Sequence, residues 1–202
     1  TKDLYFRIQK EQRAAAQEHY PEFDATEIFR EIIRQHSTDF TRALPAVKLE
    51  QLPGFFAETY RAASRHRLQL YPGVFETIRQ LHRNYRLAVV SDAQTAYAIP
   101  ELNAVGLYGY FDPIIVSGNY GYRKPDERIF TNALSAMGID ASEVIYVGND
   151  MHCDVFGAKR LGIKTVFFKS NQGNQEMQGV EPDYIIYHFP ELLNAVRFFE
   201  SR

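Results

Sequence analysis

The chain has 202 residues, 45% of them hydrophobic and 14% aromatic, a composition that can form a buried core and excludes intrinsic disorder. Lysine and arginine number 23 against 25 aspartate and glutamate, and the formal net charge of −2 gives no reason to expect nucleic acid or an anionic membrane as a partner. The single cysteine, Cys153, excludes an intrachain disulfide, and no apolar run approaches the ~20 residues of a membrane helix. We therefore expect a cytoplasmic protein of one or two domains.

Residues 1–70 carry helical patterns and no strand pattern. Leu4–Glu18 is rich in Ala, Gln, Arg and Lys, which favour helix, and predicts a first helix. Asp24–Glu27 has the form of a capping box that opens a second helix. Four apolar residues of this second helix recur at helical spacing and predict a buried stripe: Ile28, Phe29, Ile32 and Ile33. A third helix is predicted over residues 54–67, with three aromatic residues on its buried side: Phe55, Phe56 and Tyr60. We therefore expect a helical domain over residues 1–70.

After Tyr71-Pro72-Gly73 the pattern changes to alternating helices and strands. Five short apolar runs are predicted as strands: Leu87–Val90, Ile114–Val116, Val144–Val147, Thr165–Phe168 and Asp183–Ile186. The segments that alternate with them are predicted as helices: Val74–Leu81, a stretch that ends at Gly106, Ile129–Met137, Val155–Leu161 and Pro190–Phe199. Such alternation predicts a doubly wound parallel sheet, so we assign residues 71–202 to an α/β domain.

Polar residues follow three of the predicted strands. In doubly wound sheets the ligand binds beyond the carboxyl ends of the strands. The three segments found there are Ser91–Asp92, Ser117–Asn119 and Gly148–Asp150. The hydroxyl group of Ser91 and the backbone N–H groups after it could hold a phosphate oxygen, although a serine in this place also suits a helix cap.

Lys124 and two aspartates are further candidates for a charged site. Pro125 fixes the backbone after Lys124 and Asp126 would cap the next helix, so Lys124 would project from a rigid turn, where a lysine is often merely solvated. Asp150 and Asp154 are four residues apart at a strand-to-helix junction, so both could face one site. Two carboxylates 4 Å apart repel by about 4 kcal/mol at an effective dielectric constant near 20. Either Mg²⁺ or a lysine would relieve that repulsion, unless one acid caps the helix and the other faces water.

The order of these motifs resembles the haloacid dehalogenase superfamily. The matching residues are Ser91 at a strand end, then Lys124-Pro125, then Val147–Asp150 with Asp154, followed by Gly157–Gly162. Tyr71-Pro72-Gly73, Gly121–Asp126 and Ile129-Phe130 also match, and the resemblance covers residues 71–186 in the right order. It implies that residues 71–202 form a Rossmann-like α/β core and that residues 1–70 form the helical cap that many members insert.

The resemblance also implies a role for each candidate residue. Ser91 would hydrogen-bond the transferring phosphoryl group, assisted by the backbone of Asp92, and Lys124 would offset the negative charge of phosphate and nucleophile. Asp150, or Asn149 beside it, would bind Mg²⁺, and Asp154 would orient Lys124 or a metal-bound water. Many relatives have an acid at the position of Asn149. We expect Asp150 to be the metal ligand, because a carboxylate is the better hard ligand.

The first motif of the family, Asp-x-Asp-x-Thr at the end of the central strand, has no counterpart, because no Asp-x-Asp occurs in the sequence. Its first Asp would be the nucleophile that forms an aspartyl-phosphate. Loss of a central strand would leave several buried backbone groups unpaired at about 1–3 kcal/mol each. The sum, on the order of 10 kcal/mol, rivals the whole stability of a domain. We therefore expect an N-terminal segment or a second chain to supply that strand, and the chain as given to be inactive alone.

Three functions are consistent with these residues to different degrees, and a fourth is excluded. The first is a phosphatase that acts on a small phosphorylated metabolite through Mg²⁺ and an aspartyl-phosphate. A haloacid dehalogenase needs no metal and is disfavoured by Asp150 and Asp154. A degenerate, non-catalytic binding module of the same fold is a further alternative. A two-component receiver domain is excluded, because its Lys-Pro follows the last strands and Lys124-Pro125 precedes two or three more. His152 and Cys153 are adjacent, which does not make a zinc site without further ligands.

Overall fold

The structure, a computed structural model, describes residues 2–201 and divides into two compact units. The first unit contains the described residues up to Leu68 together with Asp92–Gly106 and Val116–Arg123. The second contains Gln69–Ser91, Leu107–Ile115 and the described residues from Lys124 onward. Each unit is thus built from separate stretches of chain, whereas the predicted domains, 1–70 and 71–202, are continuous. The outer ends of those domains, Thr1 and Arg202, lie outside the described residues.

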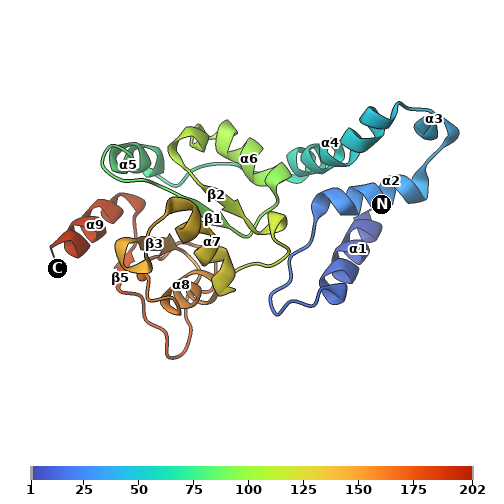
Figure 1. The fold of residues 1–202 in the computed structure, drawn as a ribbon. Helices are drawn as coiled ribbons and strands as arrows, with labels where there is room; N and C mark the ends of the chain where they lie inside the picture. The colour runs from blue at the N-terminus through green and yellow to red at the C-terminus, as the bar shows by residue number, and fades with distance from the viewer. Residues whose placement is uncertain (1, 202) are drawn as a thin grey trace. The chain divides into compact units, whose positions relative to one another are not determined.

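Helices make up the first unit (Figure 1). They are α1 (Lys2–Ala15), α2 (Ala25–His36), the short α3 (Asp39–Arg42), α4 (Ala46–Ser64) and α6 (Thr95–Ala104). The core of this unit is formed by seven buried residues: Tyr5, Ile8, Ala25, Ile28, Phe29, Ile32 and Ala57. The predicted stripe on the second helix is therefore buried at Ile28, Phe29 and Ile32. As predicted, Asp24 caps α2 and accepts hydrogen bonds from the N–H groups of Thr26 and Glu27.

The prediction for the third helix was wrong in two respects. The helix α4 begins eight residues earlier than residue 54, at Ala46, and contains Pro53. Its buried residues are Pro53 and Ala57, whereas Phe55 and Phe56 are 61% and 41% exposed. The aromatic side chains misled the prediction because hydrophobicity alone does not say which helix face packs, and small residues at the contact let the helices approach closely. Tyr60 is half-buried and stacks on Tyr5, with 4.8 Å between the ring centres.

The second unit contains the strands. It holds α5 (Val74–Leu81), β1 (Val89–Ser91), β2 (Ile114–Val116, whose last residue is grouped with the first unit), α7 (Glu127–Met137), β3 (Ile145–Gly148), η4 (Met151–Phe156), α8 (Gly157–Lys159), β4 (Lys164–Phe168), β5 (Tyr184–Ile186) and α9 (Leu192–Glu200). Three short 3₁₀ turns also belong to it, η1 (Tyr108–Tyr110), η3 (Ala141–Glu143) and η5 (Phe189–Glu191), whereas η2 (Ser117–Asn119) lies in the first unit. All five predicted strands are present within one or two residues of the predicted bounds. As predicted, α7 is capped by Asp126 and ends at Gly138, whose φ of 66° suits glycine.

The strands form two sheets. The first is the pair β1–β2, and the second has the order β3–β4–β5, in which β4 pairs parallel with both β3 and β5. In the register of the second sheet, Val147 lies opposite Val166 and Phe168 opposite Ile186. Within the described residues no strand pairs with both β1 and β3, and these two strands do not pair with each other. The parallel pairing confirms the predicted α/β class, and the missing central strand stays a prediction.

Both faces of the sheet β3–β4–β5 are covered by helices (Figure 1). On one face Val166, Phe168 and Ile186 pack with Leu81 of α5 and with Leu192 and Ala195 of α9. On the other face Phe167 packs with Met151 and Val155 of η4. The residues of β4 from Thr165 to Phe168 are buried accordingly. This burial explains the continuously apolar run of that strand.

The segment after β3 differs from the prediction. An α-helix was predicted over Val155–Leu161, but a π-helical segment, η4, begins at Met151 and continues into the short helix α8. The N–H of Val155 donates to the carbonyl oxygen of Asp150, five residues back, at 3.1 Å. Asp150 also caps η4 through its side chain. Single turns of π-helix are rare and occur frequently at functional sites.

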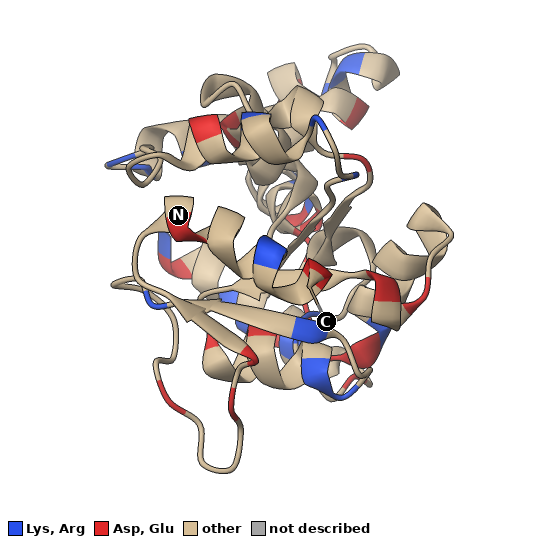
Figure 2. Cartoon of the chain, turned by 90° about the vertical axis from the view of Figure 1, so that its left-hand side faces the viewer, with Lys and Arg blue, Asp and Glu red and all other residues tan. Residues whose placement is uncertain are grey.

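Charged residues of both signs are interspersed over the helices (Figure 2). Many form pairs one turn apart, such as Arg30–Glu27 and Arg79–Glu76, with both side chains largely exposed. Arg65 is less exposed and pairs with Glu101 at 3.3 Å. No helix among residues 2–201 is both long and apolar enough to cross a membrane.

Candidate active site

A buried ion pair lies at the carboxyl end of β1 and β3. The Nζ of Lys124 is 2.7 Å from Oδ1 of Asp154, and the two side chains are 11% and 5% exposed. Lys124 directly precedes Pro125 and α7, and Asp154 lies in η4. Burial of two charges costs free energy that only close pairing and additional hydrogen bonds offset. The structure therefore brings together two of the three predicted catalytic residues.

Tyr146 and the backbone of β1 complete the surroundings of this ion pair. The Nζ of Lys124 donates to the carbonyl oxygen of Val90 and to the hydroxyl oxygen of Tyr146, both at 3.3 Å. The Tyr146 hydroxyl donates to Oδ1 of Asp154 at 3.1 Å. Burial raises the pKa of the Tyr146 hydroxyl far above its ordinary value, so the group remains a neutral donor. Val90 precedes Ser91, so Lys124 contacts the peptide that leads into Ser91.

The second oxygen of Asp154 is bound by the loop that follows β3. Its Oδ2 accepts hydrogen bonds from the backbone N–H groups of Asn149 at 2.9 Å and Asp150 at 3.0 Å. A Cβ added at Gly148 would overlap the Asp154 side chain, so glycine is required there by this close approach. The Asp154 carboxylate thus accepts from one ammonium, one hydroxyl and two amides. This arrangement is compatible with the role that the family resemblance implies for Asp154, which is to orient Lys124.

The side chain of Asp150 forms its hydrogen bonds outside this ion pair. Its Oδ1 accepts from the N–H groups of His152 at 2.9 Å and Cys153 at 2.7 Å. Its Oδ2 accepts from the backbone N–H and from Nδ2 of Asn174, both at 2.9 Å. Partial burial raises the pKa of the Asp150 carboxyl, but the N–H groups of Cys153 and Asn174 outweigh it and hold the pKa below its usual value. The carboxylate is therefore ionised and well supplied with donors.

Asn149 is less fully engaged. Its Nδ2 donates to Oγ of Ser170 at 3.3 Å, and no residue that the structure describes donates to its Oδ1. An amide oxygen is a hard ligand of the kind that Mg²⁺ accepts. The predicted repulsion between Asp150 and Asp154 is relieved without a metal, because Lys124 pairs with Asp154 and Asn174 binds Asp150. Within residues 2–201 no group of three or more His, Cys, Asp or Glu side chains could hold a metal ion.

Ser91 ends β1 and makes no side-chain hydrogen bond with the described residues. It does not cap the following helix, because Gln94 occupies the N-cap position of α6. Ser91 is therefore not a helix cap, and its hydroxyl group is available to a ligand. Asp92 begins the part of the first unit that carries α6. The phosphate-binding roles of Ser91 and Asp92 stay predictions.

The third strand end, at Ser117, is occupied by contacts within the first unit. The Ser117 hydroxyl, which is wholly buried, donates to Oε2 of Glu22 at 2.7 Å and accepts from the N–H of Ala93 at 3.0 Å. Glu22 also pairs with Arg13 at 3.1 Å. Gln94 donates to the Phe23 carbonyl oxygen at 2.6 Å and accepts from the Ala25 N–H at 2.9 Å. Ser117 therefore has a structural role in this unit.

Two residues of the site were not predicted from the sequence. Tyr146 carries the one hydroxyl group of the apolar run Val144–Val147, and a buried tyrosine hydroxyl usually needs a partner. That signal could have identified it. Asn174 lies in a loop rich in glycine and glutamine, where nothing in the local sequence indicates its contact with Asp150. The Cys153 Sγ is 3.9 Å from Nδ1 of His152, whose ring stacks on Phe156.

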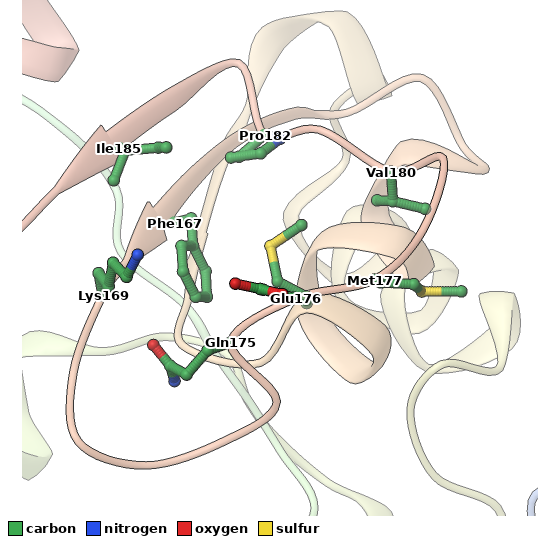
Figure 3. Close-up of a pocket in the computed structure, with 9 residues that line it drawn as sticks. Phe167, Lys169, Gln175, Glu176, Met177, Val180, Pro182 and Ile185 are labelled. Atoms are coloured by element: carbon green, nitrogen blue, oxygen red, sulfur yellow. The ribbon is translucent and has the colours of Figure 1, made fainter.

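A cavity of about 190 Å³ lies beneath the loop of residues 170–183 (Figure 3). Its lining is mainly apolar and includes Met151, Phe167, Met177, Val180 and Ile185, with Lys169 and Glu176 among the polar members. None of the predicted site residues lines it. Met151, however, directly follows Asp150, so one wall of the cavity adjoins the segment after β3.

The family model described as "Haloacid dehalogenase-like hydrolase" matches residues 1–168. The chain belongs to this family of hydrolases. A pyrophosphatase of Halalkalibacterium halodurans is 29% identical over 161 residues, which cover 79% of this chain and 74% of that protein. A glyceraldehyde 3-phosphate phosphatase of Pyrococcus furiosus is 27% identical over 176 residues, with 82% and 73% covered. The crystal structure of a 2-haloacid dehalogenase from Pseudomonas syringae superposes with a TM-score of 0.67 at 20% identity, covering 98% of this chain and 80% of that one.

These similarities confirm the family and the fold that the motifs predicted. The haloacid dehalogenase-like hydrolase contains the Rossmann-like α/β core with parallel strands and additional helices. Curated relatives in this family carry the names of phosphatases. The structural likeness to a dehalogenase shows the shared fold.

Proposed function

We propose that the protein is a Mg²⁺-dependent phosphatase of a small phosphorylated metabolite in the cytoplasm. The observation that carries this proposal is the buried ammonium of Lys124, fixed by Asp154, Tyr146 and Val90 beside the strand end that carries Ser91. Such a fixed positive charge can stabilise negative charge that develops on a transferring phosphoryl group. The pyrophosphatase and glyceraldehyde 3-phosphate phosphatase among its relatives favour phosphate over other substrates.

Each residue near the ion pair has a role in this proposal. Lys124 offsets the charge of the phosphate and the attacking carboxylate, and Asp154 holds Lys124 in place. The hydroxyl group of Ser91 donates to a phosphate oxygen, and the backbone of Asp92 assists it. Because phosphoryl transfer requires little more of the protein than positioning and charge stabilisation, these residues supply much of the chemistry.

The oxygen atoms that could bind Mg²⁺ differ in the hydrogen bonds that they already accept. Mg²⁺ commonly takes one or two carboxylates and fills its other positions with water and substrate phosphate oxygens. The Oδ1 of Asn149 suits one position, whereas both oxygens of Asp150 already accept hydrogen bonds. We therefore assign the contact to Asn149, with Asp150 behind it. The cation would reduce the negative charge of the phosphate when bound.

The nucleophile is proposed to come from a segment that precedes Thr1 or from a second chain. The separation of β1–β2 from β3–β4–β5 supports this proposal, because a strand between β1 and β3 would join the two sheets. An aspartate at the carboxyl end of such a strand would lie beside Lys124. The 202 residues given would then have no phosphatase activity alone.

The experiment is an assay of the protein with the residues encoded upstream of Thr1, against a panel of metabolite phosphates, with and without Mg²⁺. We expect phosphate release that a chelator abolishes. Substitution Lys124→Ala should lower kcat by about 100-fold or more. The matched control is Lys159→Ala, because Lys159 pairs with Asp183 at 2.9 Å on the surface. Absence of phosphate release over the whole panel would favour the non-catalytic alternative.

Metal-independent dehalogenation is retained as a second candidate because Asp150 and Asp154 are satisfied without a cation. The chelator separates the two candidates. Halide release from a 2-haloacid that persists in chelator would support dehalogenation, and phosphate release that requires Mg²⁺ would exclude it as the main activity.

A further inference from the structure

We propose that Asn174 is a positioning residue, which holds the Asp150 carboxylate away from the metal position and fixes the backbone of residues 149–151. This inference rests on the proposed function for its catalytic consequence. Asp150 lies next to Asn149 and is the residue that the sequence favours as the ligand, because a carboxylate is the better hard ligand. Its side chain is instead bound to a loop 24 residues further along the chain.

The contact between Asn174 and Asp150 involves both side chains and the backbone. The backbone N–H and the Nδ2 of Asn174 both donate to Oδ2 of Asp150 at 2.9 Å, and Nδ2 is also 3.2 Å from Oδ1. In return, the N–H of Met151 donates to the carbonyl oxygen of Asn174 at 2.8 Å. With the N–H groups of His152 and Cys153, the Asp150 carboxylate has four donor groups. A carboxylate offers about four lone-pair sites, so little capacity is left for a metal.

The neighbours of Asn174 fit the same arrangement. Gly173 has a φ of +77°, and a Cβ on it would overlap the carbonyl oxygen of Asn149, so the loop backbone approaches the strand end as closely as it can. Ser170 accepts from Nδ2 of Asn149 at 3.3 Å. Farther along the loop, Met177 and Val180 pack on the buried cluster that contains Met151. The loop is therefore attached at several points to residues 149–151.

A continuous set of contacts leads from Asn174 to the ion pair. Asn174 fixes Asp150, and the backbone N–H groups of Asn149 and Asp150 bind Oδ2 of Asp154. The other oxygen of Asp154 binds Lys124. A change at Asn174 should thus reach the charged group of the site, although Asn174 touches neither Lys124 nor Asp154. Partners of this indirect kind commonly change metal affinity or activity on the order of 10-fold to 100-fold when removed.

The first test uses hydrogen exchange of the protein with the residues encoded upstream of Thr1. Asn174→Ala removes the side-chain donor and leaves the backbone N–H. We expect faster exchange in two segments, residues 149–154 and residues 170–179. The matched control is Asn171→Ala in the same loop, where Asn171 accepts from the Tyr71 hydroxyl at 2.5 Å and does not contact Asp150. Unchanged exchange in residues 149–154 of Asn174→Ala would overturn the proposal.

A second set of variants tests the charge of the contact. Asn174→Asp has nearly the same shape but places a carboxylate against Asp150, so it should disturb exchange more than Asn174→Ala does. The double variant Asp150→Asn with Asn174→Asp restores one donor–acceptor pair and should recover part of the protection. If Asn174→Asp behaves like Asn171→Ala, Asn174 is only a surface residue and the proposal is wrong.

The third test uses the enzyme with its upstream residues and separates positioning from general destabilisation. For Asn174→Ala we expect kcat to fall or the Mg²⁺ half-saturation concentration to rise, on the order of 10-fold, with KM for the phosphate substrate unchanged. Asn149→Ala should raise the Mg²⁺ half-saturation concentration more than Asp150→Ala does. The opposite order, with loop exchange unaffected in Asp150→Ala, would identify Asp150 as the metal ligand and overturn the proposal. If the enzyme releases no phosphate at all, the proposed function fails, and the exchange measurements still decide the role of Asn174.

Discussion

Lys124 and Asp154 form an ion pair of 2.7 Å in which both side chains are almost fully withdrawn from solvent. Thirty residues separate them in the sequence, and they are held together by the turn before α7 and the π-helical segment after β3. A pair in such a place is sensitive to the loss of either member, because the remaining charge has no solvent to stabilise it.

The first prediction concerns this pair. Asp154→Asn keeps the size of the side chain but leaves Lys124 without its counter-charge, so the free energy of unfolding should fall by about 3–5 kcal/mol. Urea denaturation measures the difference. Glu27→Gln is the control, because Glu27 pairs with Arg30 on an exposed face and its loss should cost less than about 1 kcal/mol. Equal effects of the two substitutions would contradict the burial of the Lys124–Asp154 pair.

The second prediction concerns the hydroxyl of Tyr146. Tyr146→Phe removes a donor to Asp154 and an acceptor for Lys124, and should lower the free energy of unfolding by about 1–3 kcal/mol. Because the three side chains contact one another, the effects of Tyr146→Phe and Asp154→Asn should not add. A double-mutant cycle should give a coupling energy above about 0.5 kcal/mol, and strict additivity would argue against the contact.

The third prediction compares two glycines. Gly148→Ala introduces a methyl group that overlaps Asp154, and overpacking of this kind should lower the free energy of unfolding by about 1–3 kcal/mol. Gly54→Ala lies within α4, where an added Cβ meets no atom within 4 Å. It should raise the free energy of unfolding by up to about 1 kcal/mol, because alanine favours helix over glycine. Thermal unfolding of both variants should therefore shift in opposite directions.

The fourth prediction concerns pH. Partial burial raises the pKa of the Asp183 carboxyl, but hydrogen bonds from Lys159 and Thr165 outweigh it and hold the pKa below its usual value. A carboxyl whose pKa is lowered by folding stabilises the fold above its unfolded pKa of about 4. This stabilisation is lost as the pH falls through the lower pKa of the folded state. The difference in Tm between the natural chain and Asp183→Asn should thus be largest near neutrality and shrink below about pH 4. A difference that grows on acidification would have the wrong sign.

The fifth prediction concerns Ser117 in the first unit. Ser117→Ala leaves the partly buried Ala93 N–H without its acceptor and removes the buried donor to Glu22. The free energy of unfolding should fall by about 1–3 kcal/mol. Ser135→Ala, on the exposed face of α7, should change it by less than about 0.5 kcal/mol. Chemical denaturation of the two variants compares them directly.

Local signals in the sequence predicted most elements of the fold. The cap at Asp126 and the end of α7 at Gly138 were predicted correctly, because a cap and a left-handed glycine act within one turn of the chain. Phe55 and Phe56 were predicted to be buried and are exposed. Which face of α4 is buried depends on its packing against α2, and the sequence of α4 alone does not show this. The π-helical start at Met151 could not be predicted either, because its geometry depends on the cap formed by Asp150.

The residues of the site were predictable to different degrees. Lys124 and Asp154 were found through the family resemblance, and the structure brings them into contact. The preference for Asp150 over Asn149 followed from the chemistry of single residues. That chemistry does not include Asn174, because its contact with Asp150 spans 24 residues and leaves no periodic pattern in the sequence. Contacts of this kind are set by tertiary packing, which is why ligand assignments from sequence need the surrounding hydrogen bonds.

The composite make-up of the first unit has a practical consequence for anyone who exchanges parts between relatives. Glu22, Phe23 and Ala25 depend on Ser117 and Gln94, and Arg61 and Arg65 depend on Glu101. A chimera that receives only residues 2–68 from another enzyme would meet foreign partners at each of these points. Residues 92–106 and 116–123 should be transplanted together with the helices, as one set, so that the first unit keeps its own hydrogen-bond and ion-pair partners.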